Sequence, residues 1–531
     1  MTMGCAQSVI EFTGLGGDAA AQIDLPQLVT DAQAGVKPET MRRIIKTINA
    51  AMARDSEYCL EFARLEGTAG LVTQWISTKE SRTLLGGLHI LEACCKFEPG
   101  AKVLCNQENI AVLHEKVKNK DRAVVRLVMH SLQGFASLER NRALMGDEGT
   151  LQICAQMLKT KDLELLSCVL AILQLLTIEQ PLADKFCEEQ DHEQLQKVLF
   201  ETMKKDDTAV EKNALLLVGR LVTVAAFADR ICNEKNGDRL KVLLAHARDN
   251  IPSRKLAATL SIVNMSLHKE LRMVMVRKRA LQLFVELGRI ESQRADQAEY
   301  QRVAATGISR LCTNFQMRDL AAKVGVLEVV MKMLGSTNLE VKRAAARACA
   351  ELTLHEENGR RLALSGAIRP LLDMARSGDR LAESDAILAI NNMAITEANQ
   401  NQIMQEGGKG ALAYLKVHQN LGVAKMAENV IKRVRMNKLR SAARFAGKLA
   451  LAQKRTEGEG EGGEGKKKDE DEDEDSPTKG VAYGGDAYGG APGGYGGDAA
   501  ASNGYERGQE NLPGVVPPLP GGNALANTLF G

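Results

Sequence analysis

The chain has 531 residues, of which 44% are hydrophobic, 26% charged and 4% aromatic, and its formal net charge is +2. This length excludes the miniature disulfide-stapled folds, and the scarcity of aromatic residues argues against an all-β sandwich. No run of roughly 18 uncharged apolar residues occurs, and the N-terminal region lacks the pattern of a secretory signal. We therefore expect a helical, cytoplasmic protein.

The first motif in chain order lies at the N-terminus. Residues Met3–Ser8 read MGCAQS, which matches the N-myristoylation pattern Met-Gly-x-x-x-Ser/Thr if Met3 is the initiator. Gly4 would then accept myristate and Cys5 would be available for palmitate, and two acyl chains anchor a protein stably where one does so marginally. Initiation at Met1 would remove the acceptor at Gly4, and the sequence leaves the initiator open. We assign residues 1–38 to an N-terminal segment with this acylation site.

An internal repeat of about 42 residues follows over residues 39–435. A glycine ahead of an apolar run recurs at Gly325, Gly366 and Gly407, in two steps of 41 residues. The apolar residue that closes each predicted inner helix recurs in steps of 42, 41, 41, 45, 44, 46, 41, 41 and 37 residues. These closing residues are Met52, Cys94, Phe135, Leu176, Leu221, Met265, Leu311, Leu352, Met393 and Val430. The period predicts an all-α, right-handed superhelical solenoid of about ten repeats, each of two or three helices.

The repeat resembles the armadillo family. The resemblance is carried by the segments RACAELT at 347–353, GAIRPLL at 366–372 and LAINNMA at 388–394, and it covers roughly residues 40–435. It is strongest over residues 300–420; before residue 300 the longer steps are also typical of HEAT repeats. The resemblance implies a concave groove, lined by the inner helices, that binds other proteins.

In armadillo proteins, a row of asparagines along the groove binds an extended partner. In this chain the equivalent position, called the ladder position, is the residue directly before each closing residue. Only three of these ten ladder positions are asparagine, and the single tryptophan, Trp75, lies outside them. The resemblance therefore does not extend to the basic-peptide clamps of nuclear-import receptors. We predict partner contacts at four ladder residues, namely Arg220, Asn264, Arg310 and Asn392.

No motif for catalysis, metal binding or cofactor binding fits its context. A GxGxxG pattern begins at Gly460, but no strand precedes it and no helix follows. The eight histidines are isolated from one another, and the eleven cysteines are scattered through apolar segments, where we expect reduced, buried thiols. We expect a protein that is not an enzyme and needs no cofactor.

A basic amphipathic helix is predicted at residues 436–455, after the last repeat. Its basic surface begins within that repeat and comprises Lys432, Arg433, Arg435, Lys438, Arg440, Arg444 and Lys448. Such a helix is suited to capping the solenoid, or to binding an anionic membrane surface or an acidic cytoskeletal surface. Nucleic acid is disfavoured as a partner because aromatic residues for base stacking are scarce here.

Residues 456–531 form an acidic tail rich in glycine and proline. They contain 15 acidic and 5 basic side chains, a balance of −10, so that residues 1–455 carry +12. A segment of this composition cannot bury enough apolar surface to offset its ordering entropy, and we expect disorder. The acidic block at 469–475 could screen the basic helix.

These features predict a non-catalytic scaffold or adaptor that binds other proteins in its groove and is tethered by acylation to the cytosolic face of a membrane. In this architecture the chain resembles the acylated armadillo-only adaptor proteins. One alternative is a microtubule-associated armadillo protein of the cytoskeleton or cilium. A second is an armadillo protein similar to the myosin chaperones.

Overall fold

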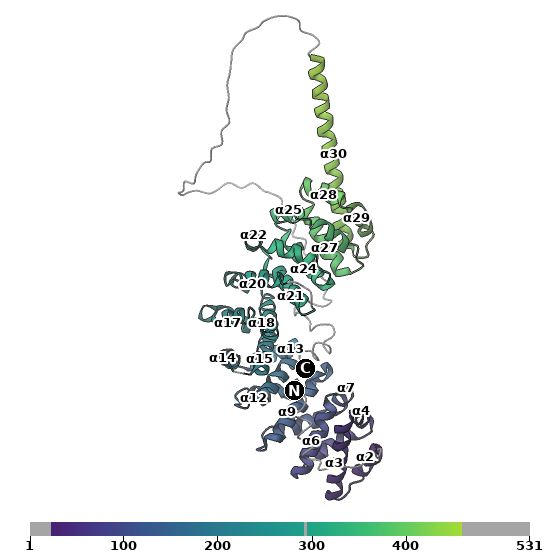
Figure 1. Ribbon diagram of the computed structural model, residues 1–531, viewed down its shortest axis with the longest axis vertical. Coiled ribbons are helices and arrows are strands. Elements are labelled where there is room, and N and C mark those ends of the chain that lie inside the picture. Colours follow the sequence, from purple (N-terminus) through teal and green to yellow (C-terminus); the bar gives the residue numbers. More distant parts are fainter. Residues whose placement is uncertain (1–22, 206, 291–294, 459–531) are drawn as a thin grey trace. The chain divides into compact units, whose positions relative to one another are not determined.

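The structure, a computed structural model, describes residues 23–205, 207–290 and 295–458. These residues form helices joined by short connections, and no strand occurs among them (Figure 1). The chain divides into two compact units, one containing the helices up to Ile431 and the other beginning at Lys432. The predicted acylation site, Gly4 and Cys5, and nearly all of the acidic tail lie outside the described residues.

The first unit is built from repeats of three helices. The first helices are α4 (Glu57–Arg64), α7 (Glu98–Leu104), α10 (Glu139–Asp147), α13 (Gln180–Glu189), α16 (Ala225–Asn233), α19 (Arg272–Arg277), α22 (Phe315–Lys323), α25 (Glu356–Leu364) and α28 (Glu397–Gln405). The second helices are α2 (Leu25–Gln33), α5 (Thr68–Ser77), α8 (Gln107–Lys116), α11 (Thr150–Met157), α14 (His192–Thr202), α17 (Asp238–His246), α20 (Ala280–Gly288), α23 (Val326–Leu334), α26 (Ile368–Met374) and α29 (Gly408–Lys416). Short 3₁₀ turns, η1 (Glu234–Gly237) and η2 (Lys269–Leu271), precede α17 and α19.

The third helix of each repeat is the inner helix. The inner helices are α3 (Pro38–Arg54), α6 (Ser81–Cys95), α9 (Arg122–Ser137), α12 (Leu163–Leu176), α15 (Thr208–Leu221), α18 (Pro252–Met265), α21 (Ala295–Leu311), α24 (Leu339–Leu352), α27 (Arg380–Met393) and α30 (Leu421–Gly458). Each inner helix from α3 to α24 contacts the next one along the chain. The prediction of an all-α, armadillo-like solenoid of about ten repeats is confirmed.

The predicted closing residues mark the ends of the inner helices. From α12 to α27 every inner helix ends at its predicted closing residue. All six of these residues are fully buried or 1% exposed. Repeats before residue 300 also have three helices, so the HEAT-like interpretation of that region does not apply.

Helices extend beyond both ends of the predicted repeat array, residues 39–435. Helix α2 begins the packed region at Leu25, because Leu25, Val29 and Ala32 form a buried face that contacts α3, α4 and α5. At the other end α30 is one continuous helix through the predicted boundary, since no proline interrupts residues 421–458.

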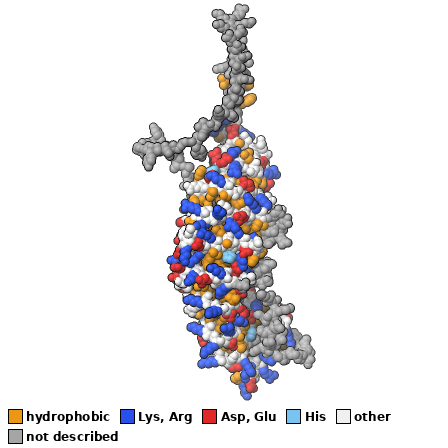
Figure 2. All heavy atoms as spheres, turned by 60° about the vertical axis from the view of Figure 1, so that its left-hand side comes forward, with side chains coloured by type: hydrophobic (Ala, Val, Ile, Leu, Met, Phe, Trp, Pro, Cys, Tyr) orange, Lys and Arg blue, Asp and Glu red, His pale blue; other side chains and the backbone are white. Residues whose placement is uncertain are grey.

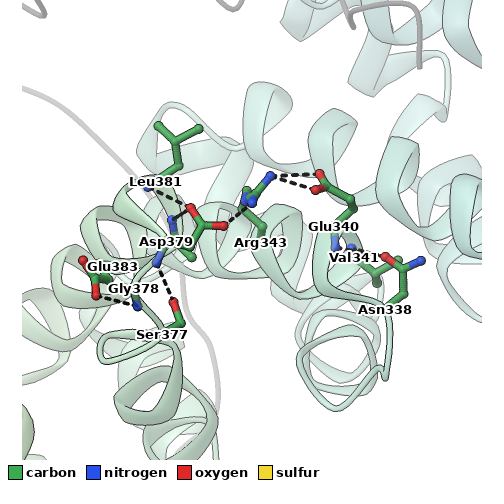
Figure 3. Close-up of polar contacts among 10 residues, drawn as sticks. Asn338, Glu340, Val341, Arg343, Ser377, Gly378, Asp379, Leu381 and Glu383 are labelled. Carbon is green, nitrogen blue, oxygen red and sulfur yellow. Dashed lines mark hydrogen bonds and ion pairs between the residues drawn. The ribbon is translucent and has the colours of Figure 1, made fainter. Parts of the chain in front are cut away.

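Side-chain caps begin several inner helices and tie neighbouring repeats together (Figure 3). Asn338 accepts hydrogen bonds from two backbone N–H groups at the start of α24, and Asp379 does the same for α27. Arg343 of α24 forms ion pairs with Glu340 and with the cap residue Asp379 of the next repeat. These contacts fix the start of one inner helix against its neighbour.

Gly307 marks the closest approach of α21 to its own second helix, α20. A Cβ atom added at Gly307 would lie 2.4 Å from ring atoms of Phe284, which is fully buried. We predict that Gly307→Ala lowers the free energy of unfolding by about 1–3 kcal/mol through this overpacking. Chemical denaturation monitored by circular dichroism measures the change.

The matched control is Gly410→Ala in α29, where an added Cβ atom meets nothing within 4 Å. This variant should be neutral or stabilised by up to about 1 kcal/mol, because alanine is the better helix former. Equal destabilisation by both substitutions would contradict the close contact at Gly307.

Candidate functional site

On several inner helices, side chains at a spacing of four reach the surface. On α15, Lys212, Leu216 and Arg220 are half-buried, whereas the residues between them, 213–215 and 217–219, are buried. On α21 the half-buried residues at the same spacing are Arg302, Thr306 and Arg310. A spacing of four places such residues on one helix face, and the flanking inner helices cover the rest. The ladder position ends each row.

We define the inner stripe as these three positions on each of the eight inner helices from α6 to α27. Its 24 residues are Leu85, His89, Ala93, Arg126, His130, Gly134, Ser167, Ala171, Leu175, Lys212, Leu216, Arg220, Leu256, Leu260, Asn264, Arg302, Thr306, Arg310, Arg343, Arg347, Glu351, Ser384, Leu388 and Asn392. Seven are lysine or arginine and one is acidic, which gives a net charge of +6.

Charges are distributed differently on the outer helices. Figure 2 turns the side of Figure 1 that carries α17 and α20 toward the viewer, and basic and acidic side chains are interspersed there with small apolar areas.

Three of the four predicted partner-contact residues also bind the preceding repeat. Each donates a hydrogen bond to the same backbone position, the carbonyl two residues before the closing residue of the preceding inner helix. The bonds are Asn264 Nδ2 to Gly219 O (2.8 Å), Arg310 Nη1 to Val263 O (3.0 Å) and Asn392 Nδ2 to Ala350 O (3.1 Å). Asn264 is only 3% exposed. A contact of these three residues with a partner stays a prediction.

Arg220 is the exception among the predicted contacts. Its side chain makes no hydrogen bond and no ion pair within the part of the chain that the structure describes. Burial and the nearby positive charge of Arg142 lower the pKa of Arg220 below its usual value. Its nitrogen atoms are not enclosed, because none is a buried atom lacking a partner. Arg220 thus presents a half-buried cation without a counterion.

A second group of arginines, which the sequence prediction missed, lies at the ends of the inner helices. Each of these arginines is the seventh residue after a closing residue. Its side chain donates a hydrogen bond to the backbone carbonyl of the residue that directly follows that closing residue. The bonds are Arg142 Nε to Ala136 O (3.2 Å), Arg272 Nε to Ser266 O (2.8 Å) and Arg318 Nε to Cys312 O (3.0 Å). Cations are favoured at helix C-termini, where carbonyls lack intrahelical partners. These arginines could have been found in the sequence, because each lies seven residues after a closing residue.

These caps add positive charge around Arg310. Burial, followed by repulsion from Arg347, Arg272 and Arg302, lowers the pKa of Arg310 to about 10. The single acidic residue of the inner stripe, Glu351, lies 3.7 Å from Arg318. The α21–α24 region therefore brings several arginines close together, most of them with carboxylate partners.

The N-terminal part of the inner stripe contains an ion pair across α6 and α9. His130 Nδ1 lies 3.6 Å from Glu92 Oε1, which also contacts Lys96 Nζ at 3.0 Å. Hydrogen bonds with Cys168 and Glu92 raise the pKa of His130 to about 10. Burial alone would raise the pKa of Glu92, but His130 and Lys96 outweigh it and lower that pKa to about 2.

The predicted basic surface on α30 is exposed except at Arg433, which is half-buried. Apolar side chains between these cations are exposed as well, with Leu439 65%, Phe445 70% and Leu449 52% accessible. Elsewhere, the ten described cysteines are buried and free, as expected. Among the described residues, no helix is long and apolar enough to cross a membrane, and no three potential ligands group to hold a metal ion.

Comparisons with known proteins show the fold alone. No protein-family model matches the chain, and no curated protein matches it. A crystal structure of an engineered protein is 17% identical with a TM-score of 0.66, covering 78% of this chain and 99% of its own. A designed armadillo repeat protein is 20% identical with a TM-score of 0.41, covering 45% and 99%. Another, solved in complex with a (KR)4 peptide, is 20% identical with a TM-score of 0.40, covering 45% and 99%.

The Glu92–His130 pair predicts a pH-dependent contribution to stability. Because the pKa of His130 is raised from 6.5 to about 10, its contribution is complete below pH 6.5 and is lost as the pH rises toward 10. Because the pKa of Glu92 is lowered from 4.5 to about 2, its contribution is complete above pH 4.5 and is lost toward pH 2. A double-mutant cycle of Glu92→Gln and His130→Asn should give a coupling of about 1–3 kcal/mol at pH 6 and much less near pH 10.

The exposed pair Arg64–Glu57 is the matched control, since both side chains are more than 60% accessible. Its cycle should give a coupling near zero at both pH values because solvent screens exposed pairs. A coupling between Glu92 and His130 that does not change with pH would contradict the assignment.

Proposed function

We propose that this protein is a non-catalytic scaffold that holds an extended segment of another protein along the inner stripe. The observation that carries the proposal is the narrow row of accessible residues on successive inner helices. A row of accessible side chains that continues from one inner helix to the next fits an extended polypeptide, whose backbone can follow the row from repeat to repeat. Leu216, Leu256 and Leu260 offer apolar contacts in the row, and Arg220 offers a polar one.

Site-specific photocrosslinking tests this function. A photoreactive amino acid at Leu260, in the inner stripe, should crosslink the full-length protein to a discrete partner in extracts of its native source. Val417, which follows α29 and is 82% exposed, is the control position outside the stripe. Crosslinking at 417 with none at 260 would place the binding surface elsewhere.

We further propose that the scaffold is tethered to the cytosolic face of a membrane. The motif at Gly4 and Cys5 supports double acylation, and the exposed cations and apolar residues of α30 support an additional contact with anionic lipid. Each lysine or arginine near an anionic surface contributes about 1 kcal/mol of attraction. Arg440, Arg444 and Lys448 follow one another at spacings of four and therefore share one face of the helix.

Vesicle flotation tests the α30 contact. The doubly substituted chain Arg440→Glu/Lys448→Glu should bind phosphatidylserine-containing vesicles at least about tenfold more weakly than the unmodified chain, because two attractive charges become repulsive. The control Arg122→Glu/Lys241→Glu makes the same charge change at two exposed residues of the repeats and should bind as the unmodified chain does.

Unchanged flotation of the α30 variant would contradict the lipid contact. Sedimentation of the unmodified chain with microtubules, combined with no flotation, would favour the cytoskeletal alternative. The acylation itself is tested by the intact mass of the natural N-terminus, with hydroxylamine release of a thioester at Cys5.

A further inference from the structure

We propose that the inner stripe recognises an acidic segment of a partner protein, with two acidic sites about six residues apart that pair with Arg220 and Arg310. The inference rests on the proposed scaffold function and specifies the chemistry of the bound segment. It is carried by the missing counterion of Arg220 and by the apolar residues between the two arginines.

Carboxylates balance most of the positive charge of the inner stripe. Seven cations and one carboxylate, Glu351, lie along the row. Four of the seven form ion pairs with six carboxylates outside the row. These pairs are Arg126 with Asp162 and Glu164, Arg302 with Glu299, Arg343 with Glu340 and Asp379, and Arg347 with Asp385. Arg220 forms no ion pair with any described residue, so an acidic group of a partner is attracted to this point of the row.

Arg220 is the anchor of the proposed contact. Its guanidinium is partly removed from water, faces the positive charge of Arg142 and makes no hydrogen bond or ion pair with any described residue. A partly buried cation in this state is unfavourable for the unbound chain. A carboxylate from a partner would supply the missing acceptor, in two parallel hydrogen bonds that match the planar guanidinium.

The residues between Arg220 and Arg310 set the spacing of the bound segment. Helix α18, which lies between α15 and α21, contributes no charge to the row, only Leu256, Leu260 and the buried Asn264. Packed helices lie roughly 10 Å apart, so two steps span about 20 Å. An extended chain covers this distance in about six residues. The segment should therefore carry apolar residues between its two acidic sites.

Peptide binding to the full-length chain tests the inference. The probe is a fluorescent peptide with two Asp-Glu pairs separated by four apolar residues, and its partner probe has Asn-Gln at both pairs. Fluorescence anisotropy should show that the acidic peptide binds at least tenfold more tightly than the amide peptide, with an affinity that falls steeply as salt is added. Arg220→Gln should weaken binding of the acidic peptide about tenfold.

Matched variants separate a direct contact from a general loss of charge or of folding. Arg122→Gln removes the same charge from an exposed position at the start of α9 and should leave binding unchanged. Arg220→Lys keeps the charge but not the planar guanidinium and should recover part of the affinity, which a misfolded variant could not do. Thermal unfolding of each variant confirms that the solenoid is intact.

Two results would overturn the inference. One is equal binding of the acidic and amide peptides, and the other is equal weakening by Arg220→Gln and Arg122→Gln. Either result would leave the scaffold function standing if position 260 crosslinks to a partner, because that experiment does not depend on the charge of the bound segment. Loss of crosslinking at 260 would instead remove the scaffold function itself.

Discussion

Each inner helix from α6 to α24 is packed on both flanks by the inner helices of the neighbouring repeats, and this constraint shapes the remainder of the repeat. Helices α12, α15, α18, α24 and α27 all have 14 residues. The steps between consecutive closing residues of these helices nevertheless vary from 41 to 45 residues. Additional residues are accommodated in the outer helices and connections, such as η1 (Glu234–Gly237). Helix α21, which has 17 residues and follows the longest step of 46, takes some of them into the inner helix itself.

The same constraint explains how much of the fold the sequence predicts. Closing residues could be followed through the chain because a buried apolar side chain is required at the end of every inner helix. We followed the glycine ahead of the second helix only near the end of the array, although Gly67, Gly149 and Gly237 also begin second helices, α5, α11 and α17, with a left-handed backbone. Gly325 and Gly407 begin second helices with a left-handed backbone, but Asp191 begins α14 with a side-chain cap and Arg279 takes the left-handed conformation before α20. Different residues meet one structural requirement there, so the repeat weakens in sequence while persisting in structure.

The candidate site was predicted by position but not by role. Periodicity placed Asn264 and Arg220 at equivalent points on consecutive inner helices. It could not show that Asn264 donates to Gly219, because that acceptor is a backbone carbonyl 45 residues away that every residue type provides. The charge of the inner stripe was also missed, since it appears only when residues four apart on eight helices are gathered into one row.

A ladder residue can either bind the preceding repeat or remain available to a partner, and the structure shows how α15 leaves Arg220 available. Asn264, Arg310 and Asn392 all donate to the preceding inner helix. On α15 an equivalent tie is made two turns earlier, where Asn213 Nδ2 donates to the backbone oxygen and the hydroxyl oxygen of Ser167 on α12, both at 3.1 Å. Because Asn213 holds α15 against α12, Arg220 is not required for that contact. The guanidinium of Arg220 can therefore donate its hydrogen bonds to a bound segment. The other three residues already use part of their hydrogen-bonding capacity within the fold.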